Sequence, residues 1–184
     1  MPSDRHRLMR LCRALPLWLA LAALPARALQ LETAGFSLGR IDVLDSGKDA
    51  EGSLELTFGT WSPAWLPRRL PKPRPLVGLL ATSDGTLYSF AGFSFEMPIS
   101  RRFSFTPSVV AGAYSHGGDR HLGSSLEFRS SAEIIFDLSP RQRLGLAFRH
   151  ISNAGTARHN PGTELLDLSF HFRLDGGGTA AVRP

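Results

Sequence analysis

A regular alternation of apolar and polar side chains over residues 122–138 constrains the fold more than any other feature of the sequence. The even positions from Leu122 to Leu138 are mostly apolar, whereas the odd positions are mostly charged or serine. Successive side chains of a β-strand point to opposite faces, so this pattern predicts a strand with one apolar and one charged face. The same alternation recurs in three other segments, 54–58, 103–111 and 166–174.

Weaker alternation extends the number of expected strands to eight. The additional segments are 34–44, 75–82, 86–97 and 142–152. Turn-forming residues separate the strands at 45–47, 83–85, 97–98, 117–119 and 139–140. An all-β fold, an antiparallel eight-stranded β-barrel over residues 29–174, accommodates these strands and leaves no unpaired edge. Residues 175–184 then form a Gly-rich C-terminal tail.

Residues 1–28 have the three parts of a secretory signal peptide. An Arg-rich start is followed by an apolar run over 14–24 and by the small residues around Ala28. The apolar run is too short to span a bilayer as a helix, and no later apolar run is long enough either. We therefore expect cleavage near Ala28. The single cysteine, Cys12, lies within this peptide, so the mature chain would contain no cysteine.

The basic character of the chain is concentrated in the same segment. The whole sequence has a net charge of +5, of which residues 1–28 contribute +4. The remaining residues are nearly neutral, so we expect no nucleic-acid partner.

Two kinds of barrel share this alternation. In a transmembrane barrel the apolar face contacts lipid, and in a soluble lipocalin-like barrel it lines the interior. Alternating segments of 13 to 17 residues are longer than soluble sheets usually need, which favours the transmembrane barrel. The Pro-rich stretch from Pro63 to Pro75 is expected to be a connection. The nearby Trp61 and Trp65 fit either an aromatic anchor at a membrane interface or ordinary packing. The basic residues of the stretch, Arg68, Arg69, Lys72 and Arg74, fit either contacts with lipid phosphates or a solvated loop, and we favour the solvated loop.

A group of polar residues interrupts the apolar face near the end of the chain. His150 and Ser152 are two residues apart on one strand, so both continue the apolar row of 144–148. Glu164 heads the apolar row of the next strand. If Ser152 lies opposite Glu164, then His150 lies opposite Leu166, and Glu164 is its diagonal neighbour. A Ser-His-acid set can activate the serine hydroxyl as a nucleophile.

The loop that joins these two strands is rich in groups that could donate hydrogen bonds. Asn153, Gly155, Asn160 and Gly162 lie there, and their amides could stabilise an oxyanion. His116, Asp119 and His121 share an earlier loop, but their spacing fits no defined metal site. We expect no metal and no cofactor.

The run His150-x-Ser152-Asn153-Ala154-Gly155, with Asn160-x-Gly162 and Glu164 after it, resembles the lipid A 3-O-deacylases of Gram-negative outer membranes, the PagL family. The upstream segment 122–128 is similar to that family as well. The resemblance implies a serine esterase with Ser152 as nucleophile, His150 as general base and Glu164 as orienting acid. Asn160, with a backbone amide near Asn153 to Gly155, would hold the oxyanion.

The resemblance also implies the surroundings of the protein. The substrate would be lipid A of lipopolysaccharide, and the active site would face the outer leaflet of the outer membrane. The oligomeric state stays open, a homodimer included. Two alternatives from other classes remain, a non-enzymatic small outer-membrane barrel and a soluble lipocalin-like binder of apolar ligands.

Overall fold

The computed structural model describes residues 26–44, 49–118 and 121–174. The expected C-terminal tail and nearly all of the expected signal peptide lie outside these residues. Ala26–Leu29 form a short 3-10 helix, η1. Strands follow at Leu31–Ile41 (β1), Ala50–Phe58 (β2), Pro73–Thr82 (β3), Leu87–Phe95 (β4), Met97–Pro98 (β5), Phe103–Phe105 (β6), Ser108–Ser115 (β7), Leu126–Asp137 (β8), Gln142–Ser152 (β9) and Thr163–Arg173 (β10).

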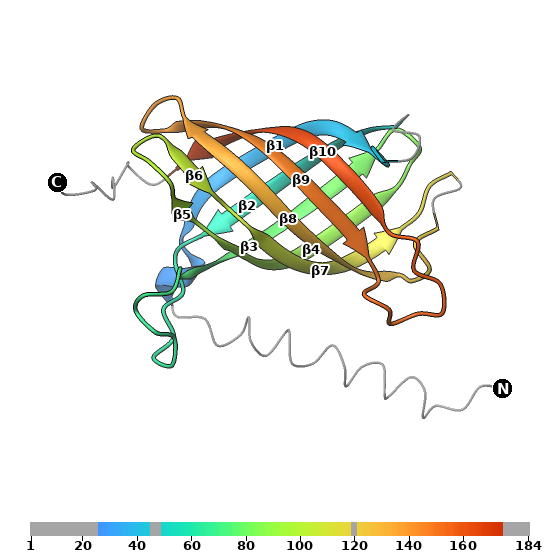
Figure 1. The fold of residues 1–184 in the computed structure, drawn as a ribbon, viewed down its shortest axis with the longest axis horizontal. Helices are drawn as coiled ribbons and strands as arrows, with labels where there is room; N and C mark the ends of the chain where they lie inside the picture. The colour runs from blue at the N-terminus through green and yellow to red at the C-terminus, as the bar shows by residue number, and fades with distance from the viewer. Residues whose placement is uncertain (1–25, 45–48, 119–120, 175–184) are drawn as a thin grey trace.

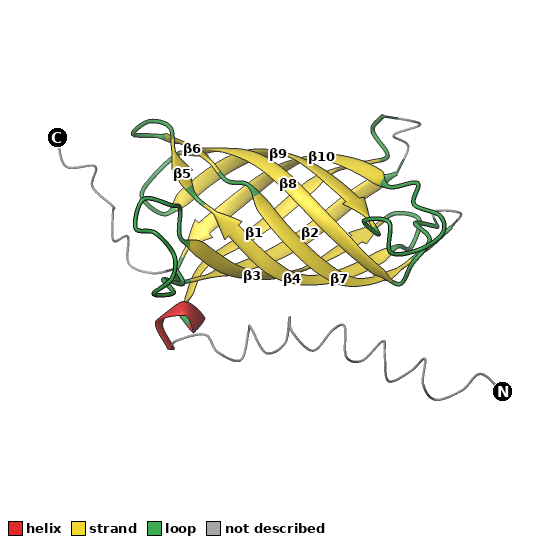
Figure 2. Ribbon diagram, turned by 60° about the horizontal axis from the view of Figure 1, so that its bottom comes forward, coloured by secondary structure: helices red, strands yellow, loops and turns green. Residues whose placement is uncertain are grey.

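Eight long antiparallel strands close into a barrel, as predicted (Figure 1, Figure 2). Each strand pairs with its neighbours, and closure comes from the pairing of β1 with β10. The short strands β5 and β6 continue β4 and β7, because β6 and β7 pair with successive parts of β8. The expected turn at 97–98 is wrong, since both residues belong to β5. The continuous strand expected over 103–111 is interrupted at Thr106 and Pro107, where proline has no N–H for the ladder.

The apolar face of the barrel points outward. In β9 the exposed residues are Leu144, Leu146 and Phe148, while Arg143 and Arg149 are buried in the lumen. The soluble lipocalin-like alternative needs these apolar rows in the interior and is therefore wrong. A hollow in the lumen beside Glu55 and Glu133 measures only about 30 Å³, which is room for about one water molecule. Side chains therefore fill this lumen, as expected for a barrel of eight strands.

Ion pairs cross the lumen and join several of its buried charges. Arg149 donates to Asp167 at 2.8 Å and to Glu55 at 2.5 Å. Arg129 lies 2.9 Å from the same Glu55 carboxylate. Further along, Glu133 accepts hydrogen bonds from Ser169 and His171, where Gly145 leaves room that a Cβ would fill. The charged residues that the alternation places on one face thus form a connected interior.

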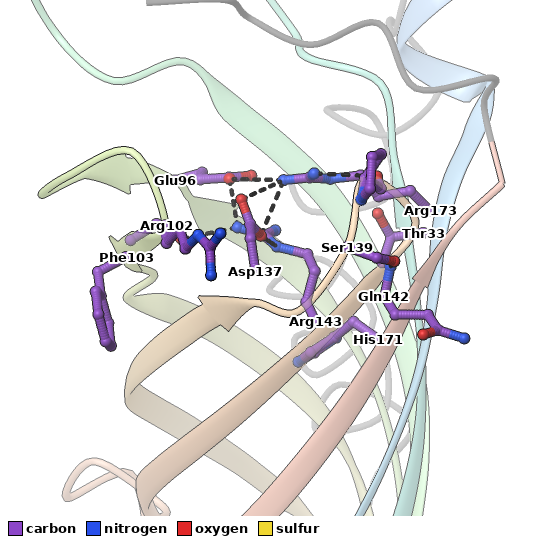
Figure 3. Close-up of polar contacts among 12 residues, drawn as sticks. Thr33, Glu96, Arg102, Phe103, Asp137, Ser139, Gln142, Arg143, His171 and Arg173 are labelled. Carbon is purple, nitrogen blue, oxygen red and sulfur yellow. Dashed lines mark hydrogen bonds and ion pairs between the residues drawn. The ribbon is translucent and has the colours of Figure 1, made fainter.

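A second set of ion pairs lies at the end of the barrel where β1 begins and β10 ends, here called the N/C end. Arg143 bonds to Asp137 at 2.6 Å and to Glu96 at 2.7 Å, and Arg173 approaches the same Asp137 carboxylate (Figure 3). Arg74 joins Glu96 to Glu32 from the other side. These contacts tie the segment around β5 to the barrel wall.

The long connection between β2 and β3 also lies at the N/C end. It spans residues 59–72, so the expected connection at Pro63–Pro75 is correct as far as Lys72 and wrong for the last three residues. Residues 73–75 join β3 because they pair with β4 alone, while pairing with β2 starts at Leu76. Prolines are tolerated where one side of the strand has no partner. The 153–162 loop lies at the opposite end (Figure 1), here called the site end.

Candidate active site

The candidate residues lie where β9 and β10 reach the site end. Ser152 is the last residue of β9, and Glu164 is the second residue of β10. Both continue the outward rows of their strands, next to the exposed Phe148 and Leu166. A polar group therefore lies on the outer surface of the barrel, where its apolar belt reaches the site end.

His150 and Glu164 form the central contact. Glu164 pairs directly with His150 across the two strands, and His150 Nδ1 lies 3.1 Å from Glu164 Oε1. The expected pairing of Glu164 with Ser152 is wrong by two residues, because Ile151 pairs with Thr163. A shift of two keeps every side chain on its face, and the new register brings the acid closer to the imidazole than expected. The ring is 42% exposed and the carboxylate 22%, so both can meet a substrate from outside.

Two serines flank the imidazole. Ser152 is two residues along β9, at about 6.5–7 Å between Cα atoms for a regular strand. Ser130 pairs with His150 on the opposite side, from β8. Among the described residues, no hydrogen bond joins the Ser152 hydroxyl to the His150 ring. Such contacts are often long before substrate binds. Ser130 is an even position of the alternating segment 122–138 and so falls on its apolar face, but no sequence pattern links it to this site.

Asn153 forms the centre of the 153–162 loop. Its side chain is fully buried. Its Nδ2 donates to the carbonyls of Leu122 at 2.8 Å and His159 at 2.7 Å, and its Oδ1 accepts from the Gly155 amide at 3.0 Å. The Asn153 backbone amide in turn donates to Asn160 Oδ1 at 2.9 Å. The amides of Asn153 and Gly155, expected near an oxyanion, are thus engaged within the loop.

The same contacts orient Asn160. Its side-chain oxygen is held by the Asn153 amide, so its NH₂ group is the end directed away from that bond. Asn160 is exposed. Among the described residues, the donors of Asn153 and Gly155 have partners, whereas the side-chain NH₂ group of Asn160 has none.

Gly162 fixes the approach of the chain to the imidazole. It has a φ of +68°, and a Cβ at this position would lie 2.9 Å from His150 Cε1. Glycine is therefore suited to this position both by its conformational freedom and by its lack of a side chain.

The loop 116–125 lies at the same end. The rings of His116 and His121 are 3.5 Å apart between centroids, while Asp119 lies outside the described residues. Within the described part of the chain, no three His, Cys, Asp or Glu residues gather in a way that could hold a metal.

In that same part, no helix is long and apolar enough to cross a membrane.

Comparisons with known proteins extend over this region. The sequence model of the Lipid A 3-O-deacylase (PagL) family matches residues 43–173. The "Lipid A deacylase PagL" of Bordetella bronchiseptica is 34% identical over 82 residues, which cover 44% of this chain. The alignment spans 46% of the Bordetella protein, so the chain matches about half the length of that relative.

Solved structures are similar in fold. The crystal structure of the outer membrane enzyme PagL matches with a TM-score of 0.57 and 21% identity, over 77% of this chain and 99% of that one. A de novo designed transmembrane β-barrel matches with a TM-score of 0.55 and 8% identity, over 79% and 97% of the two chains. These identities support the shared barrel architecture and nothing finer.

Proposed function

Because this chain belongs to the lipid A 3-O-deacylase (PagL) family, we propose that it hydrolyses the ester-linked 3-hydroxyacyl chain at position 3 of lipid A. The single observation that carries the proposal is the His150–Glu164 contact of 3.1 Å on the outer face, beside Ser152. A closed barrel with an apolar exterior lies in the outer membrane. A polar group on its outer surface therefore meets lipid substrates within the bilayer plane.

The chemistry follows from the positions of the three side chains. The Ser152 oxygen attacks the ester carbonyl while His150 Nε2 takes its proton. Glu164 holds Nδ1 and so leaves Nε2 free to take the serine proton. The tetrahedral intermediate expels the sugar oxygen, which takes the proton from His150 and leaves an acyl-enzyme. Water then attacks the acyl-enzyme with His150 as general base, and the products are a 3-hydroxy fatty acid and free Ser152.

Asn160 is the donor that we assign to the oxyanion. Its NH₂ group is free within the described residues, and its carbonyl oxygen is fixed by Asn153. A donor held before the reaction starts stabilises developing charge without a reorganisation cost.

The location of the site explains the choice of substrate. An even number of strands places both termini on the periplasmic side, so the 153–162 loop is outside. The polar group is then level with the outer leaflet, where lipid A resides. The exposed apolar side chains of Phe148 and Leu166 lie next to it and suit a fatty acyl chain.

Mass spectrometry of lipid A from cells that express the chain tests this proposal. The wild type should remove one 3-hydroxyacyl chain, and Ser152→Ala should remove none. The matched control is Ser130→Ala, because Ser130 is also on the outward face beside His150; this variant should retain activity within a factor of about ten.

The folding of each variant is checked by its faster migration on a denaturing gel before heating. Full activity of a folded Ser152→Ala protein would contradict the serine mechanism. A loss of deacylation in Ser130→Ala alone would indicate that Ser130, and not Ser152, is the nucleophile. An inactive wild type would favour the alternative of a non-enzymatic outer-membrane barrel.

A further inference from the structure

The β2–β3 connection contains basic residues that have no role in the proposed function. Short turns are typical of the periplasmic end of outer-membrane barrels, and the N/C end has one such turn at 138–141. The β2–β3 connection, however, has fourteen residues, 59–72. It extends from the end of the barrel opposite to the 153–162 loop (Figure 1). We call it the basic loop, after Arg68, Arg69 and Lys72.

Backbone contacts give the basic loop a defined shape. The Trp61 amide donates to Pro73 O at 2.8 Å, which closes the base of the loop. Two turns follow, in which Leu66 donates to Pro63 O and Leu70 donates to Pro67 O, each at 3.0 Å. Prolines at these turns restrict the chain before any ligand binds.

Aromatic stacking places the loop at the edge of the lipid-facing surface. Trp61 stacks on Phe93 with 5.7 Å between ring centroids, and Phe93 belongs to the outward row of β4. Trp65 contacts Trp61 edge to face at 6.4 Å and is itself 74% exposed. Tryptophans at the margin of the apolar belt are typical of a membrane interface. The loop therefore lies level with the lipid headgroups.

The three basic side chains of the loop have no ion-pair partner in the part of the chain that the structure describes. Arg74, at the start of β3, forms ion pairs with Glu32 and Glu96. By contrast, Arg68, Arg69 and Lys72 are exposed, and none forms an ion pair with another described residue. Arg68 and Lys72, together with Ser62, line an open cavity within the loop.

We propose that this cavity binds the phosphate of an anionic glycerophospholipid from the inner leaflet of the outer membrane. Two cations and a hydroxyl match a phosphodiester with its glycerol headgroup. The neighbouring Trp65 and Leu70, both exposed, can contact the upper part of the acyl chains. The ligand chemistry is that of phosphatidylglycerol, and the binding is separate from the proposed deacylation at the other end of the barrel.

The test uses the full-length barrel in nanodiscs that contain phosphatidylglycerol and phosphatidylcholine in equal amounts. Native mass spectrometry then identifies which lipids remain on the protein. The wild type should retain phosphatidylglycerol selectively. Arg68→Gln with Lys72→Gln should lower this retention roughly ten- to thirtyfold, since each interfacial cation contributes on the order of one kcal/mol.

The matched control removes two charges from the same end of the barrel without touching the cavity. Arg69 belongs to the basic loop but is not among the cavity residues, and Arg101 is exposed in the 99–102 turn. Arg69→Gln with Arg101→Gln should change retention less than about threefold. An equal loss in both double variants would show that only diffuse charge acts and would overturn the proposal.

Two further measurements separate lipid from free phosphate and binding from catalysis. Excess inorganic phosphate should fail to displace the retained lipid; displacement would show a simple anion site and overturn the lipid assignment. Equal retention of phosphatidylcholine would show that the cavity does not select an anionic headgroup and would also overturn the proposal. Deacylation of lipid A by Arg68→Gln with Lys72→Gln should match the wild type, so failure of the lipid site and failure of the proposed function are distinguishable.

Discussion

At the scale of single residues, the proposed role of Glu164 depends on its contact with one imidazole nitrogen of His150. Glu164→Gln retains the shape but loses the negative charge that stabilises the imidazolium, and Glu164→Ala also frees the ring. We expect deacylation to fall by roughly two to four powers of ten in both, whereas His150→Asn should abolish it. Rates of fatty acid release from purified, folded variants check this order. A Glu164→Ala rate equal to that of the wild type would remove the acid from the mechanism.

Gly162 makes a second prediction, with a control in the same loop. Gly162 and Gly155 both have positive φ, +68° and +74°, so alanine strains the backbone at either position. Only at Gly162 would the new Cβ press on the imidazole, because nothing lies within 4 Å of a Cβ at Gly155. Gly162→Ala should therefore lower kcat at least tenfold more than Gly155→Ala. Equal rates would show that the His150 ring can move without loss of function.

The face of each candidate residue could be predicted from the sequence, but the register could not. Periodicity alone places His150, Ser152 and Glu164 on the outward face, and the structure agrees. The pairing of Glu164 with His150 depends on a ten-residue loop, whose shape is set by the bond from Asn153 to the Leu122 carbonyl, 31 residues away. No local sequence pattern predicts a contact between residues so far apart. The neighbour Ser130 was missed for the same reason.

At the scale of elements, the 153–162 loop is expected to act as one unit held by Asn153. Asn153→Ala leaves the carbonyls of Leu122 and His159 without their donor, which costs about 1–3 kcal/mol locally. The loop should then open more often. We expect faster trypsin cleavage after the exposed Arg158 and a loss of activity.

Asn160→Ala is the matched comparison for this loop. It removes the proposed oxyanion donor, at an expected cost of 10²–10³ in kcat, and also the acceptor of the Asn153 backbone amide, but it keeps the bonds to Leu122 and His159. Cleavage after Arg158 should then be slower than in Asn153→Ala, because these two side-chain bonds still hold the loop. If both variants become equally sensitive to trypsin, Asn160 supports the loop and is not a specific donor.

The strands themselves follow from the sequence where alternation is strong. The ends of the strands are predicted wrongly where a proline lies in or beside the strand. Pro107 divides one expected strand into β6 and β7, and Pro73 starts β3 within the expected connection. In both cases the presence or absence of a neighbouring strand decides whether a proline is tolerated, and this is a property of the assembled sheet.

At the scale of the whole molecule, the stability of the barrel depends on charges that meet only after closure. Arg149 of β9 contacts Glu55 of β2 across the lumen and Asp167 of the adjacent β10. The alternation predicts that these residues face inward, but it does not predict their partners. Arg149→Met leaves two buried carboxylates without their common partner, and the expected cost is about 3–5 kcal/mol.

Arg141→Met provides the control for that prediction, since Arg141 is exposed in the turn between β8 and β9; its cost should stay below about 0.5 kcal/mol. The temperature at which the fast-migrating folded band disappears measures both variants. Adding Asp167→Asn to Arg149→Met should restore part of the loss, because Asp167 has no other ion-pair partner among the described residues, whereas Glu55 keeps Arg129. The proposed active site faces outward, so Arg149→Met protein that remains folded should retain the proposed deacylation of lipid A. Equal melting of Arg149→Met and Arg141→Met would mean that water in the lumen screens these charges and that backbone pairing alone holds the barrel closed.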